Sequence, residues 1–380
     1  MKKIIRITTV PQSLRGLLKG QLRFISSHYE VIGISSSGEA LQEVEANEGI
    51  RVHAVEMTRK ISPVKDLISV WKLFWFFRKV KPFIVHTHTP KAGTVGMLAA
   101  KLAGVPHRLH TVAGLPLLVV TGKKRKLLDS VEKFTYWCAT RVYPNSKGLY
   151  EFIVKEKFAS ANKVKVIGKG SSNGIDTNFF NAENISENQK SALRAQLQIT
   201  EDQFVFVFVG RIVKDKGINE LVQAFTRLNS EFPNTKLLLV GRFEPDLDPL
   251  FPATVNEIQA NNSIVTAGYQ SDVRPYFAIS NTLVFPSYRE GFPNVVMQAC
   301  AMGINAIVTD INGCNEIIIN EQTGFVVPVR DSETLFQKMK YLYHFPEENK
   351  KMALMSRGFI KENFESSYVW NEILKEYNSL

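Results

Sequence analysis

The sequence has few cysteines, and their spacing fits neither a disulfide framework nor a metal site. Cys138, Cys300 and Cys314 are the three cysteines among 380 residues, and no two of them form a CxxC motif. Isolated thiols are typical of proteins of a reducing compartment. The sequence also shows no aspartate pair that would bind a metal, so we expect chemistry without a metal ion.

Long apolar runs are also missing. No window reaches the roughly 18 uninterrupted apolar residues that a membrane-spanning helix requires. The first ten residues, MKKIIRITTV, begin basic and turn apolar, but Arg6 interrupts them and Pro11 follows. They therefore predict a buried first strand and not a secretory signal. Together these absences predict a cytoplasmic protein.

The motifs of two large classes of protein are absent. No GxGxxG follows the first predicted strand, which argues against a dinucleotide-dependent oxidoreductase. No helix-turn-helix, zinc-finger or RNP-like motif is present to support nucleic-acid binding. Only the charge of the chain would favour a nucleic acid, and we expect none as a partner.

Acidic residues are scarce in the first half of the chain. Residues 1–185 carry 29 Lys and Arg against 13 Asp and Glu, a net charge of +16, and the remainder has a net charge of −5. This asymmetry predicts an anionic partner, such as a phosphorylated substrate or an acidic membrane surface. A solvated basic face that aids solubility is the alternative.

Short β-branched runs alternate with helical stretches, a pattern typical of βαβ units and parallel sheets. The polar stretch 178–202 separates two such series, and Phe204–Val209 reads as a strand buried on both faces. We predict an α/β protein with two Rossmann-like, doubly wound parallel-sheet domains facing a cleft. The expected boundaries are 1–177, 178–360 and a last helical segment, 361–380. In the first half, the predicted strands are 4–10, 29–35, 51–57, 83–87 and 108–112, and the predicted helices are 14–27, 64–80, 92–102 and 125–139.

The first strand of the second domain runs into the sequence VGRIVKDKG, residues 209–217. Ligands of doubly wound sheets bind beyond the carboxyl ends of the strands. Gly210 lets the backbone turn close to such a ligand. Arg211 and Lys216 are candidates to hold a diphosphate, Arg through its fork and Lys as a point charge. A basic loop that caps a helix is the alternative.

The sequence FPSYREGFPNVVMQA, residues 285–299, combines a strand end, a carboxylate and a helix start. Proline is favoured at a first helical position, so Pro293 predicts a helix whose free N–H groups bind a phosphate. Glu290 would then accept hydrogen bonds from sugar hydroxyls beside that phosphate. Gln298, about two helical turns further on nearly the same face, would reach a ribose. An ordinary acidic residue at a helix start is the alternative for Glu290.

A third segment, AGYQ at 267–270, follows another predicted strand, and its Gly268 and Tyr269 are candidates for contact with a nucleotide base. The series VGRIVKDKG, AGY and PSYREGFPNVVMQA resembles the family-4 retaining glycosyltransferases of the GT-B fold, whose signature is Glu, seven residues and Glu after a strand. The resemblance covers nearly the whole chain. The first half contributes FIVHTHTPKAG at 83–93, LHTVAGLPL at 109–117, YPNS at 143–146 and GSSNGID at 170–176.

The chain looks like the branch that builds bacterial surface polysaccharides on a polyprenyl-diphosphate carrier. The resemblance implies transfer of a hexose or N-acetylhexosamine from a UDP-sugar, with no cofactor, to a lipid-linked saccharide for capsule, O-antigen or exopolysaccharide. By the match of motifs, Arg211 and Lys216 bind the donor diphosphate. Glu290 positions sugar hydroxyls, and His110 of the first domain approaches the reacting centre.

The remaining implied contacts concern the backbone and the leaving group. Gly291 and Phe292 match backbone near the sugar, and the helix start up to Asn294 would stabilise the departing diphosphate. The sequence offers no clear enzymic nucleophile, so we expect front-face attack, with the leaving phosphate taking the acceptor's proton. The final helix would cross back to the first domain.

Two departures from the family pattern stand out. Gln298 replaces the second glutamate, and its amide can bond a ribose only without charge assistance, which predicts weaker donor binding. The first loop, PQSLRGLLKG at 11–20, lacks the paired glycines of many members. Gly16 and Gly20 are the candidates to replace them.

Two segments of the first domain are candidates for contact with an anionic membrane. They are LISVWKLFWFFRKVK at 67–81 and the basic TGKKRKLLDSVEK at 121–133, which follows the apolar run 115–120. Aromatic and basic residues together suit a helix that lies on anionic lipid, although the aromatics of 67–77 would equally suit the core. We expect peripheral association with the inner face of the plasma membrane.

Two other functions fit the same charge and fold. A UDP-sugar epimerase of similar two-domain shape would need neither an acceptor surface nor a lipid-facing basic patch. A non-enzymatic protein that binds anionic ligands would need only the positive charge.

Overall fold

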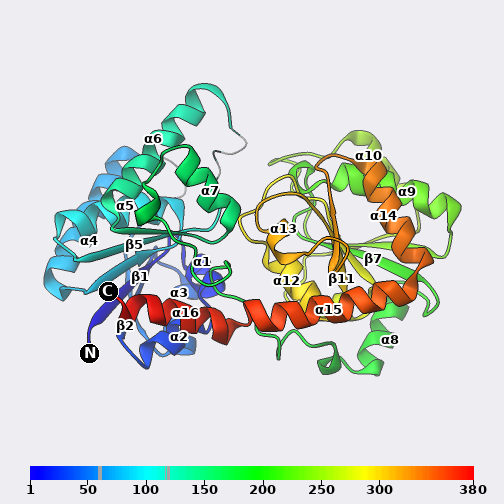
Figure 1. Cartoon of the computed structure of the whole chain (residues 1–380), viewed down its shortest axis with the longest axis horizontal. Helices are drawn as coiled ribbons and strands as arrows, with labels where there is room; N and C mark the ends of the chain where they lie inside the picture. The colour runs from blue at the N-terminus through cyan, green and yellow to red at the C-terminus, as the bar shows by residue number, and fades with distance from the viewer. Residues whose placement is uncertain (59–61, 116, 118–119) are drawn as a thin grey trace. The chain divides into compact units, whose positions relative to one another are not determined.

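The computed structural model describes residues 1–58, 62–115, 117 and 120–380 (Figure 1). Each of its two compact units is built around one parallel six-stranded sheet. The first unit consists of Met1–Gly174 and Ser366–Leu380, and the second of Ile175–Glu365. Among the described residues, no helix is long and apolar enough to cross a membrane.

The first sheet has the order β3-β2-β1-β4-β5-β6, with parallel pairing throughout. The order reverses between β1 and β4, which makes their carboxyl ends the expected ligand edge of this unit. Ile4 and Ile5 of β1 are fully buried on opposite faces, as the apolar start of the chain predicts. The strands are β1 Lys3–Ile7, β2 Glu30–Ser35, β3 Arg51–Ala54, β4 Ile84–Thr87, β5 His107–Val112 and β6 Arg141–Pro144.

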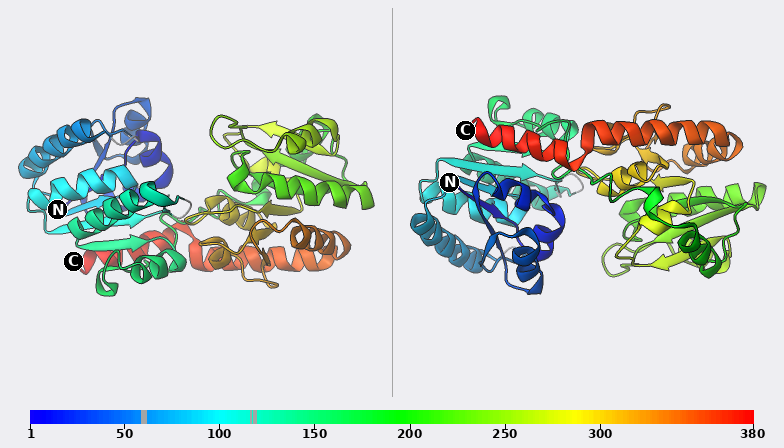
Figure 2. Two further views of the ribbon diagram at one scale, coloured as in Figure 1. Left: turned by 90° about the horizontal axis from the view of Figure 1, so that it is seen from above. Right: turned by 90° about the horizontal axis from the view of Figure 1, so that it is seen from below.

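Helices cover both faces of this sheet. One face packs against α4 Pro63–Val80, α5 Pro90–Leu102, α6 Gly122–Cys138 and α7 Lys147–Lys155. The other packs against α1 Pro11–Leu17, α2 Gln21–Ser26, α3 Glu39–Glu48 and α16 Ser366–Asn378. Figure 2 shows the last of these, the red helix α16, lying along the first unit's sheet.

The predicted single helix over 14–27 was wrong. The chain forms α1 and α2 instead, because Gly20 takes a left-handed conformation with φ of 76° between them. A Cβ on Gly20 would lie 2.6 Å from the Trp370 ring of α16. This glycine therefore serves a close approach within the first unit. Strand β6 was also missed: its sequence, RVYP, ends in a proline and carries a single β-branched residue.

The second sheet has the order β12-β11-β10-β7-β8-β9, again entirely parallel. Its central strand β7 is buried along nearly its whole length, as its continuous apolar sequence predicts. Two doubly wound parallel sheets confirm the predicted fold class. The strands are β7 Phe204–Val209, β8 Thr235–Val240, β9 Ile264–Gly268, β10 Thr282–Phe285, β11 Asn305–Thr309 and β12 Gly324–Val327.

The helices of the second unit pack around one large apolar core. The predicted polar boundary over 178–202 contains an ordered helix, α8, which belongs to this unit. The helices are α8 Glu187–Gln196, α9 Ile218–Glu231, α10 Pro252–Ala260, α11 Arg274–Ala278, α12 Asn294–Ala301, α13 Cys314–Ile317, α14 Ser332–His344 and α15 Pro346–Phe364.

The chain enters and leaves the second unit at one place. The backbone N–H of Ile175 donates to the carbonyl of Phe364 at 2.8 Å. The Glu365 carboxylate accepts hydrogen bonds from both the backbone and the hydroxyl of Thr177. The segment that enters the second unit, at residues 175–177, therefore runs beside the segment that leaves it, at residues 364–365, where α15 ends and α16 begins.

Candidate functional site

Lys216 and Glu290 form an ion pair at the carboxyl ends of β7 and β10. Both side chains are mostly buried, with 14% and 17% of their areas exposed. Gly217 follows Lys216 with φ of 70°, and a Cβ there would lie 2.1 Å from the carbonyl oxygen of Pro286. This glycine therefore lets the two loops meet, so that residues 74 positions apart in sequence come into contact.

The two oxygens of the Glu290 carboxylate have different surroundings. Oε1 accepts hydrogen bonds from Lys216 Nζ and, at 2.9 Å, from Ser287 Oγ. Oε2 accepts none from the described residues. The Asn312 side chain fixes the backbone by donating to the Glu290 carbonyl at 3.2 Å. One oxygen thus holds the side chain in place, and the other keeps its capacity to accept a hydrogen bond.

Arg211 lies on the same loop as Lys216 but pairs with a different acid. Its Nη1 is 3.3 Å from Glu244 Oε2, and the two side chains are 40% and 37% exposed. An ion pair this exposed contributes little to stability. The guanidinium is therefore held loosely and is available to a more strongly charged anion.

The start of α12 lies directly after Glu290, Gly291 and Phe292. No side chain caps it, and its first residue, Asn294, is exposed. Its first-turn N–H groups and the helix dipole favour an anion there. Phe292 is buried and contacts the Phe364 ring, with ring centres 5.2 Å apart. The buried Phe292 side chain thus fixes the backbone directly before α12.

Two details of α12 differ from the prediction. Pro293 is the residue before the helix and not its first residue. Because Glu290 precedes the helix by four positions, only about one helical turn, from Asn294, leads to Gln298. Gln298 is half-buried, and its side chain has no hydrogen bond with the described residues. The supposed shared helical face of Glu290 and Gln298 was therefore wrong.

Gly268 ends β9, and Tyr269 follows with 61% of its area exposed. The Arg242 guanidinium lies over the Tyr269 ring, 4.5 Å from its centre. A guanidinium stacked on an exposed aromatic ring offers a flat surface of the kind that nucleotide bases use. Sequence reasoning missed Arg242, which follows the end of β8 with no motif around it.

Sequence reasoning also missed groups that hold the loops of the site. Arg289, next to Glu290, is paired with Asp215 at 2.8 Å. Ser287 is fully buried, and its backbone carbonyl accepts a hydrogen bond from Thr309 Oγ1. Buried Cys314 lies near the pair, and burial, together with the Glu290 charge, raises the pKa of its thiol well above its usual range. This thiol is therefore an inert packing group.

In the first unit, His110 lies on β5 and is buried. Its Nδ1 is 2.7 Å from Thr87 Oγ1 of β4. Gly93 of α5 makes room for the ring, because a Cβ there would lie 2.4 Å from His110 Cε1. Burial lowers the pKa of His110 to about 4. The imidazole is therefore neutral at physiological pH and suited to hydrogen bonding, not to carrying charge.

Arg6 of β1 is fully buried on the face of the sheet that α1, α2, α3 and α16 cover. No carboxylate of the described residues is paired with it. Its Nε donates to His88 Nε2 at 2.9 Å, and its Nη2 donates to Gln21 Oε1. His88 must therefore carry its proton on Nδ1, an atom that is buried without a partner. Arg6 and His88 thus make the interior of the first unit polar at this point. In the sequence, only the interruption of the first apolar run by Arg6 indicated this.

Asn173 extends the Arg6 network to α16. Its side-chain oxygen accepts from Gln21 Nε2 at 2.9 Å and from Trp370 Nε1 at 2.7 Å. Tyr377 of the same helix contacts His86 of β4, with the hydroxyl 2.5 Å from Nδ1. The last helix is therefore fixed to the first sheet by polar as well as apolar contacts.

The three buried histidines predict loss of stability in acid. Burial is the main reason why the pKa values of His86, His88 and His110 are lowered. An unfolded histidine has a pKa near 6.5, so the unfolded chain binds more protons than the folded one below that pH. Their stabilisation is therefore complete above about pH 6.5 and is lost as the pH falls toward about 4.

Thermal unfolding between pH 7.5 and 4.5 measures this effect. We expect the unfolding temperature to fall more steeply with acid in the wild-type protein than in His110→Gln. The exposed-site control, His28→Gln, should keep the wild-type slope. Equal slopes in all three proteins would contradict the assignment to buried histidines.

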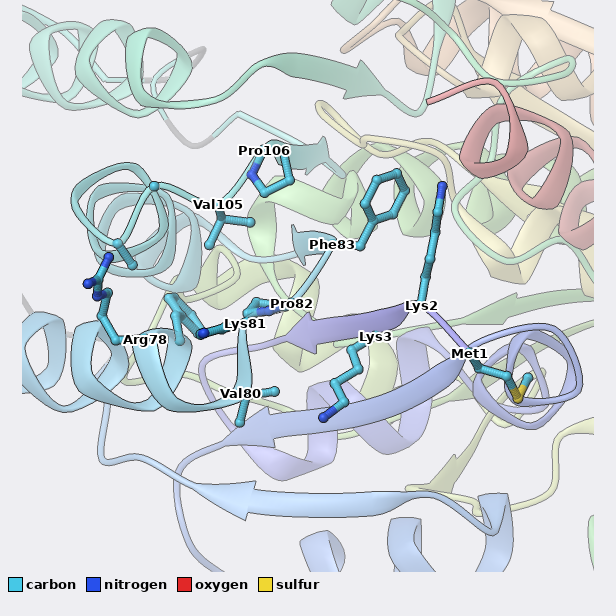
Figure 3. Close-up of a pocket in the computed structure, with 13 residues that line it drawn as sticks. Met1, Lys2, Lys3, Arg78, Val80, Lys81, Pro82, Phe83, Val105 and Pro106 are labelled. Carbon is cyan, nitrogen blue, oxygen red and sulfur yellow. The ribbon is translucent and has the colours of Figure 1, made fainter.

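A pocket of about 690 Å³ lies in the first unit, at the amino ends of its strands (Figure 3). Its walls carry the basic side chains of Lys2, Lys3, Arg78 and Lys81, and Lys2 Nζ lies 3.7 Å from the centre of the Phe83 ring. Ligands of doubly wound sheets bind at the carboxyl ends. The pocket therefore lies at the wrong edge for the predicted substrates, and it accounts for part of this unit's positive charge.

Comparison with known proteins matches both units to glycosyltransferases. Residues 189–357 match the family model described as glycosyl transferases group 1, and residues 24–170 match the glycosyl transferase 4-like domain. The capsular polysaccharide biosynthesis glycosyltransferase CapM of Staphylococcus aureus is 34% identical over 379 residues, which cover 100% of this chain and 97% of that protein.

A second relative and a solved structure agree with these matches. The UDP-Gal:alpha-D-GlcNAc-diphosphoundecaprenol alpha-1,3-galactosyltransferase of Escherichia coli is 30% identical over 307 residues, covering 80% of this chain and 76% of that protein. Anabaena Alr3699/HepE, solved in complex with UDP, superposes with a TM-score of 0.81 at 18% identity and 100% coverage of both chains, which shows the same fold. The chain belongs to the family-4 glycosyltransferases of the GT-B fold.

Proposed function

We propose that the protein is a retaining, metal-independent glycosyltransferase that moves a hexose or N-acetylhexosamine from a UDP-sugar to a polyprenyl-diphosphate-linked saccharide. The product would enter a capsule, O-antigen or exopolysaccharide. The observation that carries the proposal is the Lys216–Glu290 pair, with one carboxylate oxygen open, at the carboxyl ends of the second sheet. The Escherichia coli relative, by its name, uses UDP-galactose and a diphosphoundecaprenol-linked sugar.

The donor is proposed to bind with its diphosphate at Arg211, Lys216 and the start of α12. Two cations and a helix start supply positive charge on the side from which the phosphate departs. Arg242 and Tyr269 take the base, and Gln298 is the candidate for the ribose. Because these groups can balance the charge of the leaving diphosphate, the reaction needs no metal ion.

The sugar is proposed to lie against Gly291 and Phe292, with its hydroxyls donating to Glu290 Oε2. Cleavage of the bond from the anomeric carbon leaves an oxocarbenium-like sugar and a charged phosphate. The acceptor hydroxyl attacks on the face that the phosphate leaves, and it gives its proton to that phosphate. The anomeric configuration is retained, and no protein nucleophile is needed.

The first unit is proposed to bind the acceptor, and the second unit the donor. His110 pairs in register with Thr87, the last residue of β4, in the carboxyl half of its sheet, and its neutral ring is suited to hold a donor or acceptor hydroxyl. The positive charge of this half of the chain favours a lipid diphosphate and, with it, the inner face of the plasma membrane. The apolar run over 115–120, one of the predicted membrane segments, includes residues 116, 118 and 119, which lie outside the described residues.

Transfer assays test the proposal directly. A panel of UDP-sugars is incubated with and without a short-chain polyprenyl-diphosphate-linked sugar, and UDP release and product are measured. We expect transfer that requires the lipid-linked acceptor, retains the anomeric configuration, persists in a chelator and collapses in Glu290→Ala. Isomerisation of a UDP-sugar without acceptor would favour the epimerase instead, and the absence of UDP release from every pair would reject the donor.

A further inference from the structure

The outward face of α4 is apolar over most of the helix. Leu67, Ile68, Trp71 and Trp75 are 65%, 50%, 62% and 54% exposed, and Val64 at the helix start is 72% exposed. Val64, Ile68, Trp71 and Trp75 follow one another at intervals of three or four residues, and Leu67 lies beside Ile68, so together they form one stripe along the helix. Surface helices of soluble proteins present polar residues on this face. A contiguous exposed apolar stripe of this kind marks an interaction surface.

The stripe is not a displaced core face. The opposite side of α4 supplies Val70, Leu73 and Phe77 to the core of the first unit, and each of these is buried. The acidic residue of the helix, Asp66, also points away from the stripe, since it pairs with Lys91 of α5 at 2.5 Å. The helix thus carries one apolar face inward and a second one outward.

Basic residues flank the stripe on one side. Lys65, Lys72 and Lys79 recur at intervals of seven and are all exposed, so they form a row beside the apolar stripe. Aromatic residues in the middle with lysines along the edge suit the boundary between acyl chains and anionic headgroups. At 1.5 Å per residue, the 18 residues of α4 span about 27 Å, enough to lie along a surface.

We infer that α4 is the membrane-docking helix of this protein and that it lies flat on an anionic lipid surface. Trp71 and Trp75 enter the interfacial layer, and the lysine row contacts phosphate headgroups. The inference rests on the proposed function only in that a lipid-linked acceptor would be reached from such a surface. It names which face of the chain touches the lipid.

A second copy of the chain fits the same stripe less well. Two α4 helices packed antiparallel through their stripes would place Lys72 near Lys72 of the other copy, with Lys65 facing Lys79. Like charges at such a contact oppose association. The charge row instead complements a surface of negative sign, which a phosphatidylglycerol-containing membrane supplies.

A second helix on this face of the sheet, α6, also carries basic and aromatic residues. Both α4 and α6 pack against α5 on one face of the sheet, and Figure 1 shows α5 between them. Helix α6 opens with Lys123, Lys124, Arg125 and Lys126. Its Trp137 is 61% exposed. Arg125 is already paired with Asp129 at 2.6 Å, so we assign the docking to α4 and leave α6 out of the proposed contact.

Co-sedimentation of the full chain with phosphatidylglycerol-containing vesicles tests the inference, with phosphatidylcholine vesicles as reference. We expect the double change Trp71→Ser with Trp75→Ser to lower binding about tenfold or more. Brominated acyl chains should quench wild-type tryptophan fluorescence, and this quenching should fall in the same variant. Changing Lys65, Lys72 and Lys79 to Glu should lower binding to the anionic vesicles about tenfold or more.

Matched controls on α15 distinguish an effect of the α4 surface from a general effect of lost apolar surface or changed net charge. Leu354→Ser removes an exposed apolar side chain of α15, and the triple change Lys350→Glu, Lys351→Glu and Lys361→Glu makes the same change of charge there. Both should bind vesicles as the wild type does. Transfer to a water-soluble acceptor should persist in every variant, so that this assay reports on the proposed function and vesicle binding reports on α4.

Two results would overturn the inference. One is equal vesicle binding by the wild type and the α4 variants. The other is a wild-type dimer in solution that the tryptophan changes convert to a monomer without altering vesicle binding, since a second copy would then be the occupant of the stripe.

Discussion

Glu290→Gln should lower kcat/KM for transfer about 10²- to 10³-fold, the usual loss when one pre-placed polar group of a site is removed. The amide keeps the size of the side chain but not its charge. Lys216 then loses its ion-pair partner, and the sugar hydroxyls lose an ionised acceptor at Oε2. Initial rates at several donor concentrations measure the loss.

The matched control is Glu333→Gln, which removes an exposed carboxylate of the same unit that pairs with Arg227. Its activity should stay within about twofold of the wild type, because a surface ion pair contributes little. A Glu290→Gln enzyme that is folded and keeps more than about a tenth of the wild-type kcat/KM would remove Glu290 from the proposed machinery.

Gly93→Ala should lower transfer about 10²-fold without weakening UDP binding, because misplacing a reacting-site group by about 1 Å has this effect. The new Cβ would lie 2.4 Å from His110 Cε1 and 2.9 Å from Nδ1, so the ring must leave the position in which Nδ1 bonds Thr87 Oγ1. Steady-state rates and calorimetric titration with UDP separate the two quantities.

Two further variants define how Gly93→Ala acts. Gly358→Ala on α15 adds the same methyl group where nothing lies within 4 Å, and it should leave activity unchanged. The double variant Gly93→Ala with His110→Ala should be no worse than His110→Ala alone, because both changes act through one side chain. Independent, additive losses would show that Gly93 acts by another route.

Much of the fold follows directly from the sequence. The continuous apolar run of β7 and the alternation of strands and helices predict two parallel sheets, and both sheets are present. Gly20 limited the prediction locally, because a glycine within an apolar helical period does not reveal its own φ. Strand β6 was missed because its four residues, RVYP, include a proline and only one β-branched side chain.

Sequence motifs identified the residues proposed for the site. The residues that surround them lie outside any motif, and the sequence did not identify them. Lys216 and Glu290 stand in separate motifs, and the structure brings them into an ion pair that no spacing predicts. Arg242 and Asn312 have no motif, and only the packing of loops brings them to the site. The helical relation between Glu290 and Gln298 failed because the helix begins after Glu290, at Asn294.

For α4, the sequence could not show which of two apolar faces is exposed. Its composition alone suited both the core and a membrane. Periodicity places Leu73 and Trp71 on different faces, but it does not say which face is inward. Only the packed structure shows that the face with the two tryptophans is the exposed one.

The return of the last helix sets an order for synthesis. Val369, Ile373 and Tyr377 of α16 belong to the core of the first unit, although they leave the ribosome only after the whole second unit. The second unit, by contrast, is one continuous segment. On a nascent chain it can be completed while the first unit still exposes an apolar face. A premature stop after α15 would therefore leave the second unit whole and the first one open to aggregation or proteolysis.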